Sequence, residues 1–350
     1  MSAWQENVAL AQYTNIGLGG PARFFVSIHE AKDLTEALVA AQQRNLPVHI
    51  LGGGSNTVFA DQGFDGLVIH IALRGIDWRP QGESMLVTVG AGEDWDALVA
   101  ETVARNLAGL ECLSGIPGVV GATPMQNVGA YGQQVSDVIT NVTVLDRTTL
   151  TEHNFSNADC QFGHRDSLFK SSAVDRFVIT SVTYRLTPSG PPTLKYPQVQ
   201  AVVGSSPSLS EVREAVLTLR RQKSMVADPQ DPHSRSCGSF FVNPVMSDSE
   251  LQSLIRRYRA LGGEDDVPVF IEGDLLKVPA AWLIEHAGFA KGTRRGGVGI
   301  SPNHALGLVN YDGTTQELLS LASDVQQGVL KKFGLRLVLE PVVVAAAARG

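Results

Sequence analysis

Apolar side chains recur at helical spacing in some segments of the chain and form short continuous runs in others. In residues 30–45, Leu34 and Leu38 lie on one helical face, and apolar runs at residues 22–28 and 47–51 flank this segment. Short apolar runs bounded by turn residues are typical of buried strands. The three segments therefore predict a strand–helix–strand unit.

The same reasoning extends over the rest of the chain. Further strands are predicted at residues 66–73, 84–92, 141–147, 176–186 and 335–344. Helices are predicted at residues 93–106, 208–223, 248–261, 278–289 and 314–333. Residues 187–192 (TPSGPP) have the composition of a boundary. We therefore expect an α+β protein with an N-terminal unit, 1–187 (subdomains of about 1–72 and 73–187), and a C-terminal unit, 188–350.

Composition and charge narrow the class of protein. The chain has 350 residues, 43% hydrophobic and 18% charged, which suits a globular protein of two or three domains. Its net charge of −7 argues against a broad nucleic-acid-binding surface. Cys112, Cys160 and Cys237 form no Cys-x-x-Cys pair, so we expect neither a disulfide framework nor a zinc site. No secretory signal is visible and no stretch approaches ~18 apolar residues, so we expect a cytoplasmic protein without a membrane span.

Two glycine-rich segments stand in the N-terminal unit. GGGSN (52–56) follows a predicted strand, but it is not a P-loop, and Thr57 replaces the third glycine of a dinucleotide fingerprint. It could form a backbone nest for an anion or simply a tight turn. The second segment, residues 115–132, is also rich in glycine. Two such loops can approach an extended ligand from both sides, so together they favour a dinucleotide over a lone phosphate.

Four motifs then resemble one family in their order along the chain. They are LGGGSN (51–56), IPGVVGATPMQNVGAYG (116–132), FGHRDSLFK (162–170) and GSFFVNP (238–244). The chain resembles the UDP-N-acetylenolpyruvoylglucosamine reductase (UDP-N-acetylmuramate dehydrogenase) family from Ile16 to Val343. The resemblance implies a vanillyl-alcohol-oxidase/PCMH-type FAD-binding domain and a C-terminal substrate-binding α+β domain. It also implies NADPH and a UDP-sugar substrate, with no nucleic acid, membrane or obligate protein partner.

The resemblance implies a set of FAD-binding residues in the two glycine segments. In covalent flavoproteins of this superfamily a histidine near the first glycine loop is tethered to the flavin, whereas GGGSN offers Ser55 and Asn56. We therefore expect FAD to be bound without a covalent link. The implied contacts are Gly52, Gly53, Gly54, Ser55, Asn56, Gly118, Gly121, Ala122, Gln126, Asn127, Gly129 and Ala130.

The implied reaction reduces an enolpyruvyl ether on a UDP-sugar to a lactyl ether in peptidoglycan precursor synthesis. It requires groups that hold a carboxylate, stabilise an enolate and supply a proton. Arg165 suits the first two tasks, because its planar guanidinium can pair with a carboxylate through two hydrogen bonds. The alternative is a structural ion pair with Asp166 or Asp175. His164 stands where many members of the family have Tyr.

Ser239, in GSFFVNP, has three interpretations: a hydroxyl bonded to nearby backbone, a nucleophile, or a proton donor. No Gly-x-Ser-x-Gly elbow surrounds it, which argues against the nucleophile. The resemblance implies the proton donor. Cys237, close by, is expected only to fill space.

Glu340 is implied as a third catalytic residue, carried back to the site by the predicted strand 335–344. Leu339 stands where the family has Pro, and the alternative is a solvated carboxylate at a strand end.

For the UDP portion of the substrate the resemblance implies Tyr196, Lys223 and Asn243, and Tyr196 indicates the subtype with the longer loop. Each residue alone would fit an ordinary surface position. No metal ligands are predicted.

Two other functions stay open at this point. One is a different flavin oxidase on the same first domain, which acts on a sugar or alcohol and reacts with oxygen. The other is a non-catalytic nucleotide-binding regulator.

Overall fold

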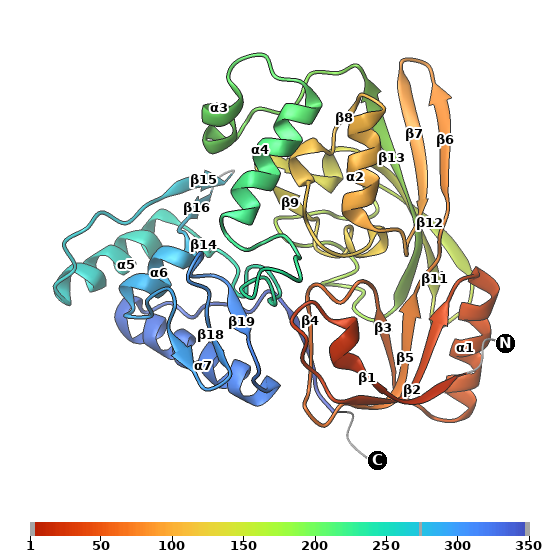
Figure 1. Ribbon diagram of the computed structural model, residues 1–350, viewed down its shortest axis with the longest axis horizontal. Helices are drawn as coiled ribbons and strands as arrows, with labels where there is room; N and C mark the ends of the chain where they lie inside the picture. The colour runs from red at the N-terminus through yellow and green to blue at the C-terminus, as the bar shows by residue number, and fades with distance from the viewer. Residues whose placement is uncertain (1–3, 273–274, 347–350) are drawn as a thin grey trace.

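The first sheet is built around the predicted strand–helix–strand unit. The computed structural model describes residues 4–272 and 275–346. In this sheet β2 (Pro21–Ile28), β5 (Phe64–Ile71) and β3 (Val48–Leu51) are parallel, and β1 (Gln5–Ala9) pairs antiparallel with β2. Helix α1 (Ala31–Gln43) connects β2 to β3 and buries the predicted Leu34 and Leu38 face against them (Figure 1). The prediction is confirmed, although β5 inserts between β2 and β3.

A second, antiparallel sheet follows. Its strands run in the order β12 (Glu152–Ser156), β11 (Ile139–Asp146), β13 (Phe177–Pro188), β7 (Ser84–Gly90) and β6 (Ile76–Gln81), and β8 (Leu107–Ala108) also pairs with β13. Helix α2 (Trp95–Ala104) starts after Asp94, whose carboxylate accepts a hydrogen bond from the N–H of Ala97 and caps the helix. Trp95 and Tyr184 are fully buried in one continuous core that also contains α1, so the two sheets share their interior.

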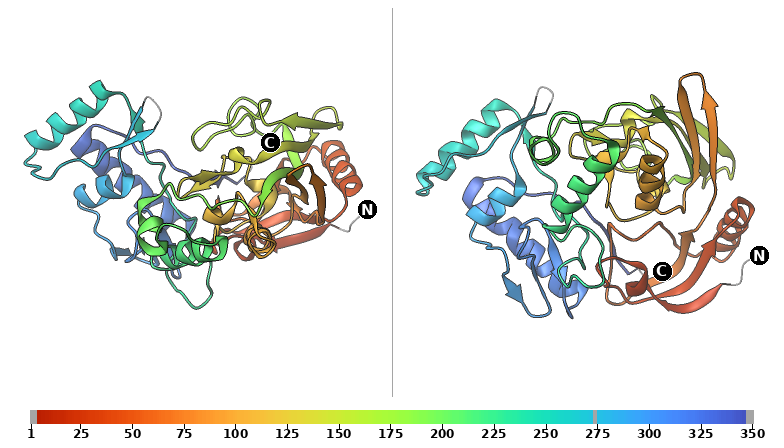
Figure 2. Two further views of the ribbon diagram at one scale, coloured as in Figure 1. Left: turned by 90° about the horizontal axis from the view of Figure 1, so that it is seen from above. Right: turned by 45° about the horizontal axis from the view of Figure 1, so that its top comes forward.

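The C-terminal part of the chain packs three helices on two small sheets. The helices are α5 (Asp248–Ala260), α6 (Ala280–His286) and α7 (Thr315–Phe333), which lie together on the side away from the first sheet in Figures 1 and 2. The sheets have the orders β14 (Val245–Met246), β16 (Leu275–Lys277), β15 (Phe270–Glu272) and β17 (Arg294–Arg295), β18 (Val298–Ile300), β19 (Leu308–Asn310). The core of this part also takes in Ile16, Leu18 and Val58 from the N-terminal half, so the two halves share buried apolar surface.

Helices α3 (Pro197–Val203) and α4 (Leu209–Arg221) lie in the chain between the second sheet and the C-terminal part. A capping box between Ser208 and Glu211 begins α4, as the sequence predicts within one residue. Arg213 of α4 forms a bidentate ion pair with Asp96 of α2, with N–O distances of 2.6 and 2.8 Å. Shorter elements complete the fold: η1 (Leu10–Tyr13), β4 (Thr57–Phe59), η2 (Glu111–Leu113), η3 (Val120–Ala122), β9 (Gly129–Ala130), β10 (Gln133–Gln134) and η4 (Val135–Asp137).

The predicted terminal strand at residues 335–344 is wrong in its extent. Only β20 (Val342–Val344) is a strand, and it pairs in parallel with β4 of the N-terminal half. Before it, Leu339 forms a single bridge with Phe241. Pro341 separates the two pairings, because proline has no N–H to donate to a ladder. The chain nevertheless returns to the N-terminal half here, as expected.

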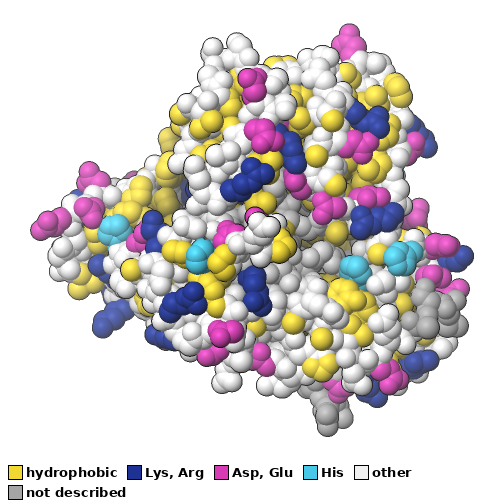
Figure 3. Space-filling model, viewed as in Figure 1, with side chains coloured by type: hydrophobic (Ala, Val, Ile, Leu, Met, Phe, Trp, Pro, Cys, Tyr) yellow, Lys and Arg dark blue, Asp and Glu magenta, His cyan; other side chains and the backbone are white. Residues whose placement is uncertain are grey.

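Among the residues that the structure describes, no helix combines the length and apolar character needed to cross a bilayer. On the face shown in Figure 3, Lys and Arg side chains are interspersed with Asp and Glu.

His49 of β3 is a half-buried titratable residue that the predicted site does not include. Its Nε2 is buried without a hydrogen-bond partner among the described residues, and its ring lies 5.2 Å from that of Phe59. Burial lowers the pKa of His49 to about 4. An unfolded histidine binds its proton near pH ~6.5, so unfolding takes up a proton between these two values. Stability should therefore fall as the pH decreases from ~6.5 to about 4.

We expect His49→Leu to remove this part of the acid sensitivity. The free energy of unfolding in urea should depend less on pH in the variant, by up to ~1.4 kcal/mol per pH unit in this range. His153→Leu, at an exposed histidine of β12, is the control and should keep the wild-type slope. Equal slopes for wild type and His49→Leu would contradict the prediction.

Candidate active site

The structure places the two glycine segments directly against each other. A Cβ on Gly53 would lie 2.7 Å from the Cα of Gly118, and one on Gly118 would lie 2.8 Å from the Oγ of Ser55. Gly54 has a φ of +61°, and a Cβ there would lie 1.9 Å from the carbonyl oxygen of Tyr13. Only glycine allows these approaches.

The second segment is fixed by the end of β7 and the start of α2. Gly121 donates its N–H to the carbonyl of Ala91 at 2.8 Å, and a Cβ on Gly121 would lie 2.5 Å from the Cβ of Ala91. The Gly118 carbonyl accepts from the N–H of Trp95 at 3.0 Å. Of the other predicted contacts, Gly52 lies beside Ala122, since its Cβ would be 3.7 Å from that of Ala122. The loops thus form a close-packed glycine cradle.

Two asparagines join this cradle to other motifs. The Asn56 amide donates to Gln126 Oε1 at 3.1 Å and to the carbonyl of Glu340 at 3.2 Å. The Asn56 carbonyl accepts from the N–H of Val342 at 2.9 Å. Asn127, which is buried, donates to the carbonyl of Gly163 at 3.0 Å. The cradle is therefore tied both to the C-terminal segment and to FGHRDSLFK.

Ser239 and Glu340 come from two paired segments. The Glu340 N–H donates to the Phe240 carbonyl, and the Val242 N–H donates to the Val338 carbonyl, both at 3.0 Å. The Phe241–Leu339 bridge sets a register in which residue 239 lies opposite residue 341. The backbones of Ser239 and Glu340 are thereby brought to adjacent positions of this pairing, from segments far apart in the sequence.

The space around Ser239 is open on one side. Gly238 has a φ of +70°, and nothing lies within 4 Å of where its Cβ would be. Ser239 itself is half-buried, and no group among the described residues hydrogen-bonds to its hydroxyl. The interpretation of Ser239 as a hydroxyl bonded to nearby backbone therefore finds no support here. Cys237 is buried, and burial raises the pKa of its thiol to about 12, so it stays protonated and unreactive.

Arg165 and Lys170 supply positive charge near Glu340. Burial raises the pKa of Glu340 above its usual value, and the charges of Arg165 and Lys170 oppose that rise. Glu340 is half-buried rather than a solvated strand end. Arg165 and Lys170 therefore lie close enough to Glu340 for their charges to affect its pKa. Lys170 was not identified from the sequence, although it ends the quoted motif.

Arg165 has an unusual backbone conformation, and hydrogen bonds fix both its side chain and its carbonyl group. Its φ is +54°, in the left-handed region, which costs free energy for a non-glycine residue. Its Nη2 donates to the Gly129 carbonyl at 2.6 Å, and Lys170 Nζ donates to the Arg165 carbonyl at 2.9 Å. Gly129 belongs to the hairpin β9–β10, so this hairpin positions the guanidinium.

Tyr196 and Lys223 meet at the tip of the same hairpin. The ring of Tyr131 lies 5.2 Å from that of Tyr196, edge to face, and Lys223 Nζ lies 5.9 Å from the Tyr131 ring centre. Burial lowers the pKa of Lys223, and the charge of Arg220 adds to this effect. Asn243 has a different setting, because its Oδ1 accepts from the N–H of Ala280 at 2.9 Å, at the start of α6.

His304 lies near Lys223 and was not identified from the sequence. Burial lowers its pKa to about 4, with Lys223 and Lys291 adding to the effect. A single histidine in SPNHAL carries no spacing pattern, so nothing in the sequence separates it from a core histidine.

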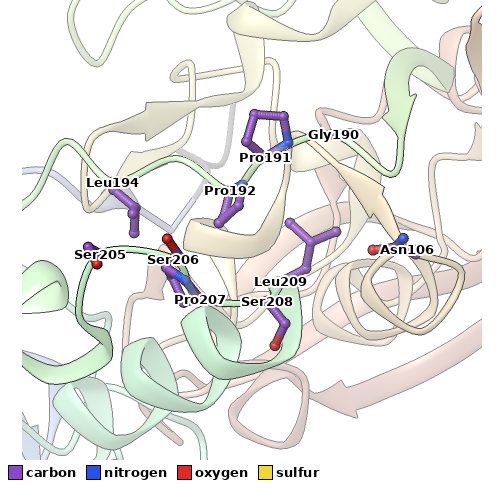
Figure 4. Close-up of a pocket in the computed structure, with 10 residues that line it drawn as sticks. All are labelled: Asn106, Gly190, Pro191, Pro192, Leu194, Ser205, Ser206, Pro207, Ser208 and Leu209. Carbon is purple, nitrogen blue, oxygen red and sulfur yellow. The ribbon is translucent and has the colours of Figure 1, made fainter.

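A cavity of about 370 Å³ lies elsewhere. Its lining contains none of the predicted site residues, and the hydroxyl of Ser208 in it is engaged in the capping box of α4 (Figure 4). Within the described residues, no group of three or more His, Cys, Asp or Glu could hold a metal ion.

The glycine cradle suits a dinucleotide cofactor. Side chains at Gly53, Gly54 and Gly118 would fill it or collide with backbone, and the amide groups of Gln126 and Asn56 lie at its edge. No histidine lies in GGGSN to form a covalent link. The residues present therefore fit FAD held without a covalent bond.

Comparisons with known proteins agree with this geometry. Residues 22–152 match the model of an FAD binding domain, and residues 229–344 match that of the UDP-N-acetylenolpyruvoylglucosamine reductase C-terminal domain. The chain is 44% identical to the UDP-N-acetylenolpyruvoylglucosamine reductase of Thermobifida fusca, over 98% of each chain. It is 45% identical to that of Saccharopolyspora erythraea, over 97% of this chain and 95% of the relative.

The fold also matches a crystal structure of UDP-N-acetylenolpyruvylglucosamine reductase from Thermus caldophilus. The TM-score is 0.68 at 24% identity, over 98% of this chain and 100% of that chain. The chain belongs to the UDP-N-acetylenolpyruvoylglucosamine reductase family.

Proposed function

We propose that this chain reduces UDP-N-acetylenolpyruvoylglucosamine to UDP-N-acetylmuramate in peptidoglycan precursor synthesis, with NADPH as the reductant. The observation that carries the proposal is the pairing of the Ser239 and Glu340 segments beside the glycine cradle, with Arg165 and Lys170 in electrostatic range. We propose a cytoplasmic location and no obligate protein partner. We also propose residues 1–187 as the FAD-binding unit and residues 188–350 as the substrate-binding unit.

The glycine cradle formed by Gly53, Gly54 and Gly118 would hold FAD, which would supply hydride transfer from NADPH to the terminal carbon of the enolpyruvyl group. Negative charge then develops at the carbon that bears the carboxylate. Arg165 pairs with that carboxylate through the guanidinium N–H groups that Gly129 does not use. Because the guanidinium is already oriented, it stabilises the enolate without reorganisation.

Ser239 donates its hydroxyl proton to the enolate carbon. A serine is a weak acid, but the enolate carbon is a strong base, and nearby positive charge stabilises the serine oxygen. Glu340 sets the charge balance among Arg165, Lys170 and the enolate and orients the donor. At the other end of the substrate, Lys223 neutralises the diphosphate, Tyr196 covers it, and Asn243 contacts the UDP portion.

The cofactor assignment has a direct test. The purified protein should be yellow, with flavin absorption bands, and denaturation should release FAD into the supernatant. FAD that stayed with the precipitated chain would contradict the absence of a covalent link. A colourless protein that binds the UDP-sugar but never FAD would instead indicate a nucleotide-binding regulator.

Glu340→Gln should slow turnover by ~10-fold or more while the fold stays intact, because the amide keeps the shape but not the charge. Steady-state NADPH oxidation with the enolpyruvyl substrate measures this, and the thermal unfolding midpoint checks the fold. Glu152→Gln, at an exposed glutamate of β12, is the control. Wild-type turnover in Glu340→Gln would show that Leu339 had misled the assignment of residue 340.

A further inference from the structure

A fully buried carboxylate lies outside the groups that the proposed reaction uses. Glu111 of η2 has an exposed fraction of 0%. Its Oε2 accepts from the N–H of Gly109 at 2.8 Å, and its Oε1 accepts from Gln133 Nε2 at 2.8 Å and from the N–H of Thr193 at 2.7 Å. Burying a carboxylate is costly unless its oxygens are bonded, so this one must be held by these donors. The donors come from three separate segments of the chain.

The first of these connections leads to Arg165. Gln133 is buried in β10, and its amide also bonds to the hydroxyl of Thr193 at 3.0 Å and to the N–H of Cys112 at 2.8 Å. In the β9–β10 hairpin, residue 133 pairs with residue 130 and residue 134 pairs with Gly129. The Gly129 carbonyl accepts from Arg165. Glu111 therefore fixes the hairpin that holds the guanidinium.

The second connection leads to Tyr196. Thr193 lies three residues before Tyr196, directly after Pro191 and Pro192. Both prolines restrict the backbone on one side of the Thr193 amide. On the other side, Tyr196 is the N-cap residue of α3, and its ring contacts that of Tyr131 at the tip of the hairpin. The two connections thus start at one carboxylate and end at residues that contact the same hairpin.

We infer that Glu111 is a positioning residue that couples Arg165 to the Tyr196 loop (residues 190–196). The inference rests on the proposed function, in which Arg165 takes the carboxylate end of the substrate and Tyr196 covers its diphosphate. By setting the hairpin and the loop together, Glu111 fixes the separation between these two ends. The site then selects substrates in which the carboxylate and the diphosphate are separated by this distance.

A matched control exists in the same half of the molecule. Asp146 is also fully buried, and its oxygens accept from the N–H groups of Thr148 and Thr149 and from Arg176. These donors belong to the second sheet and its turns, not to the hairpin or the Tyr196 loop. Asp146→Asn should therefore destabilise the fold without moving the site.

The test compares FAD-loaded Glu111→Gln with FAD-loaded Asp146→Asn. Glutamine places an N–H group where a donor already points, at Gly109 or at Gln133 and Thr193. Its remaining oxygen is uncharged and accepts more weakly, so the bonds to Gln133 and Thr193 are lost or weakened in either orientation. We expect the half-saturating concentration of UDP-N-acetylenolpyruvoylglucosamine to rise by ~10- to 100-fold and flavin reoxidation to slow, because small misplacements of binding groups have effects of this size. Amide hydrogen exchange in peptides covering residues 190–196 and 129–134 should accelerate in Glu111→Gln alone.

Unchanged exchange in both peptides of Glu111→Gln would overturn the inference, and so would an equal rise in half-saturation for Asp146→Asn. The exchange measurement does not need turnover, so a chain that failed to reduce this substrate would refute the proposed function without deciding the coupling. If Glu111→Gln does not fold, Gln133→Met tests the hairpin connection. It should slow flavin reoxidation and accelerate exchange at residues 129–134, and wild-type values for both would overturn the inference.

Discussion

A Ser239→Ala variant is expected to fold, bind FAD and accept hydride from NADPH at a near-normal rate. Reoxidation of its reduced flavin by the enolpyruvyl substrate should fall by ~10²–10⁴-fold, which is typical of a lost general acid. The reason is that the hydroxyl has no structural partner among the described residues, so its removal takes away a proton and little else. Stopped-flow absorbance at the flavin band separates the two half-reactions.

Two further variants sharpen this prediction. Ser239→Cys should keep part of the activity, because a thiol can also give up a proton. Ser236→Ala is the matched control, since Ser236 Oγ accepts from the N–H of Gly238 at 3.2 Å and acts on the local backbone. It should affect stability more than either half-reaction. A Ser239→Ala enzyme whose flavin is reoxidised at wild-type speed would end the proton-donor assignment.

Arg165→Lys is expected to lower substrate reduction by ~10²-fold although the charge is kept. An ammonium cannot hold the Gly129 carbonyl and pair with a carboxylate through a planar fork at the same time. Steady-state turnover with saturating NADPH measures the loss. Arg176→Lys is the control, because Arg176 pairs with Asp146 at the second sheet and should leave turnover near wild type. Unchanged turnover in Arg165→Lys would remove Arg165 from the catalytic residues.

The sequence predicted the buried elements well and the exposed edge strands poorly. β2, β3 and α1 were found because most of their apolar side chains are buried or half-buried in the clusters on either side of the first sheet. β12 and β6 were not predicted, because they lie at the two edges of the second sheet and most of their side chains are exposed. Edge strands lack the apolar pattern that identifies buried ones.

The sequence suggested candidate site residues but not how they are arranged in space. Asn56 and Glu340 are 284 positions apart, and only the folded chain shows that they share a hydrogen bond. Lys170, His304 and Glu111 were not singled out for the same reason, since their surroundings come from distant segments. Sequence spacing reports local structure, whereas burial and charge around a side chain depend on long-range packing.

The reaction itself tests the account most directly. The protein should be mixed with NADPH and UDP-N-acetylenolpyruvoylglucosamine without oxygen, in deuterium oxide, and the product analysed by mass spectrometry and NMR. We predict that NADPH is oxidised in proportion to the UDP-N-acetylmuramate formed, and that deuterium from the solvent enters at the carbon bearing the carboxylate. An enolpyruvyl group left unchanged without oxygen, with the reduced flavin rapidly reoxidised once air is admitted, would contradict the account and indicate a flavin oxidase.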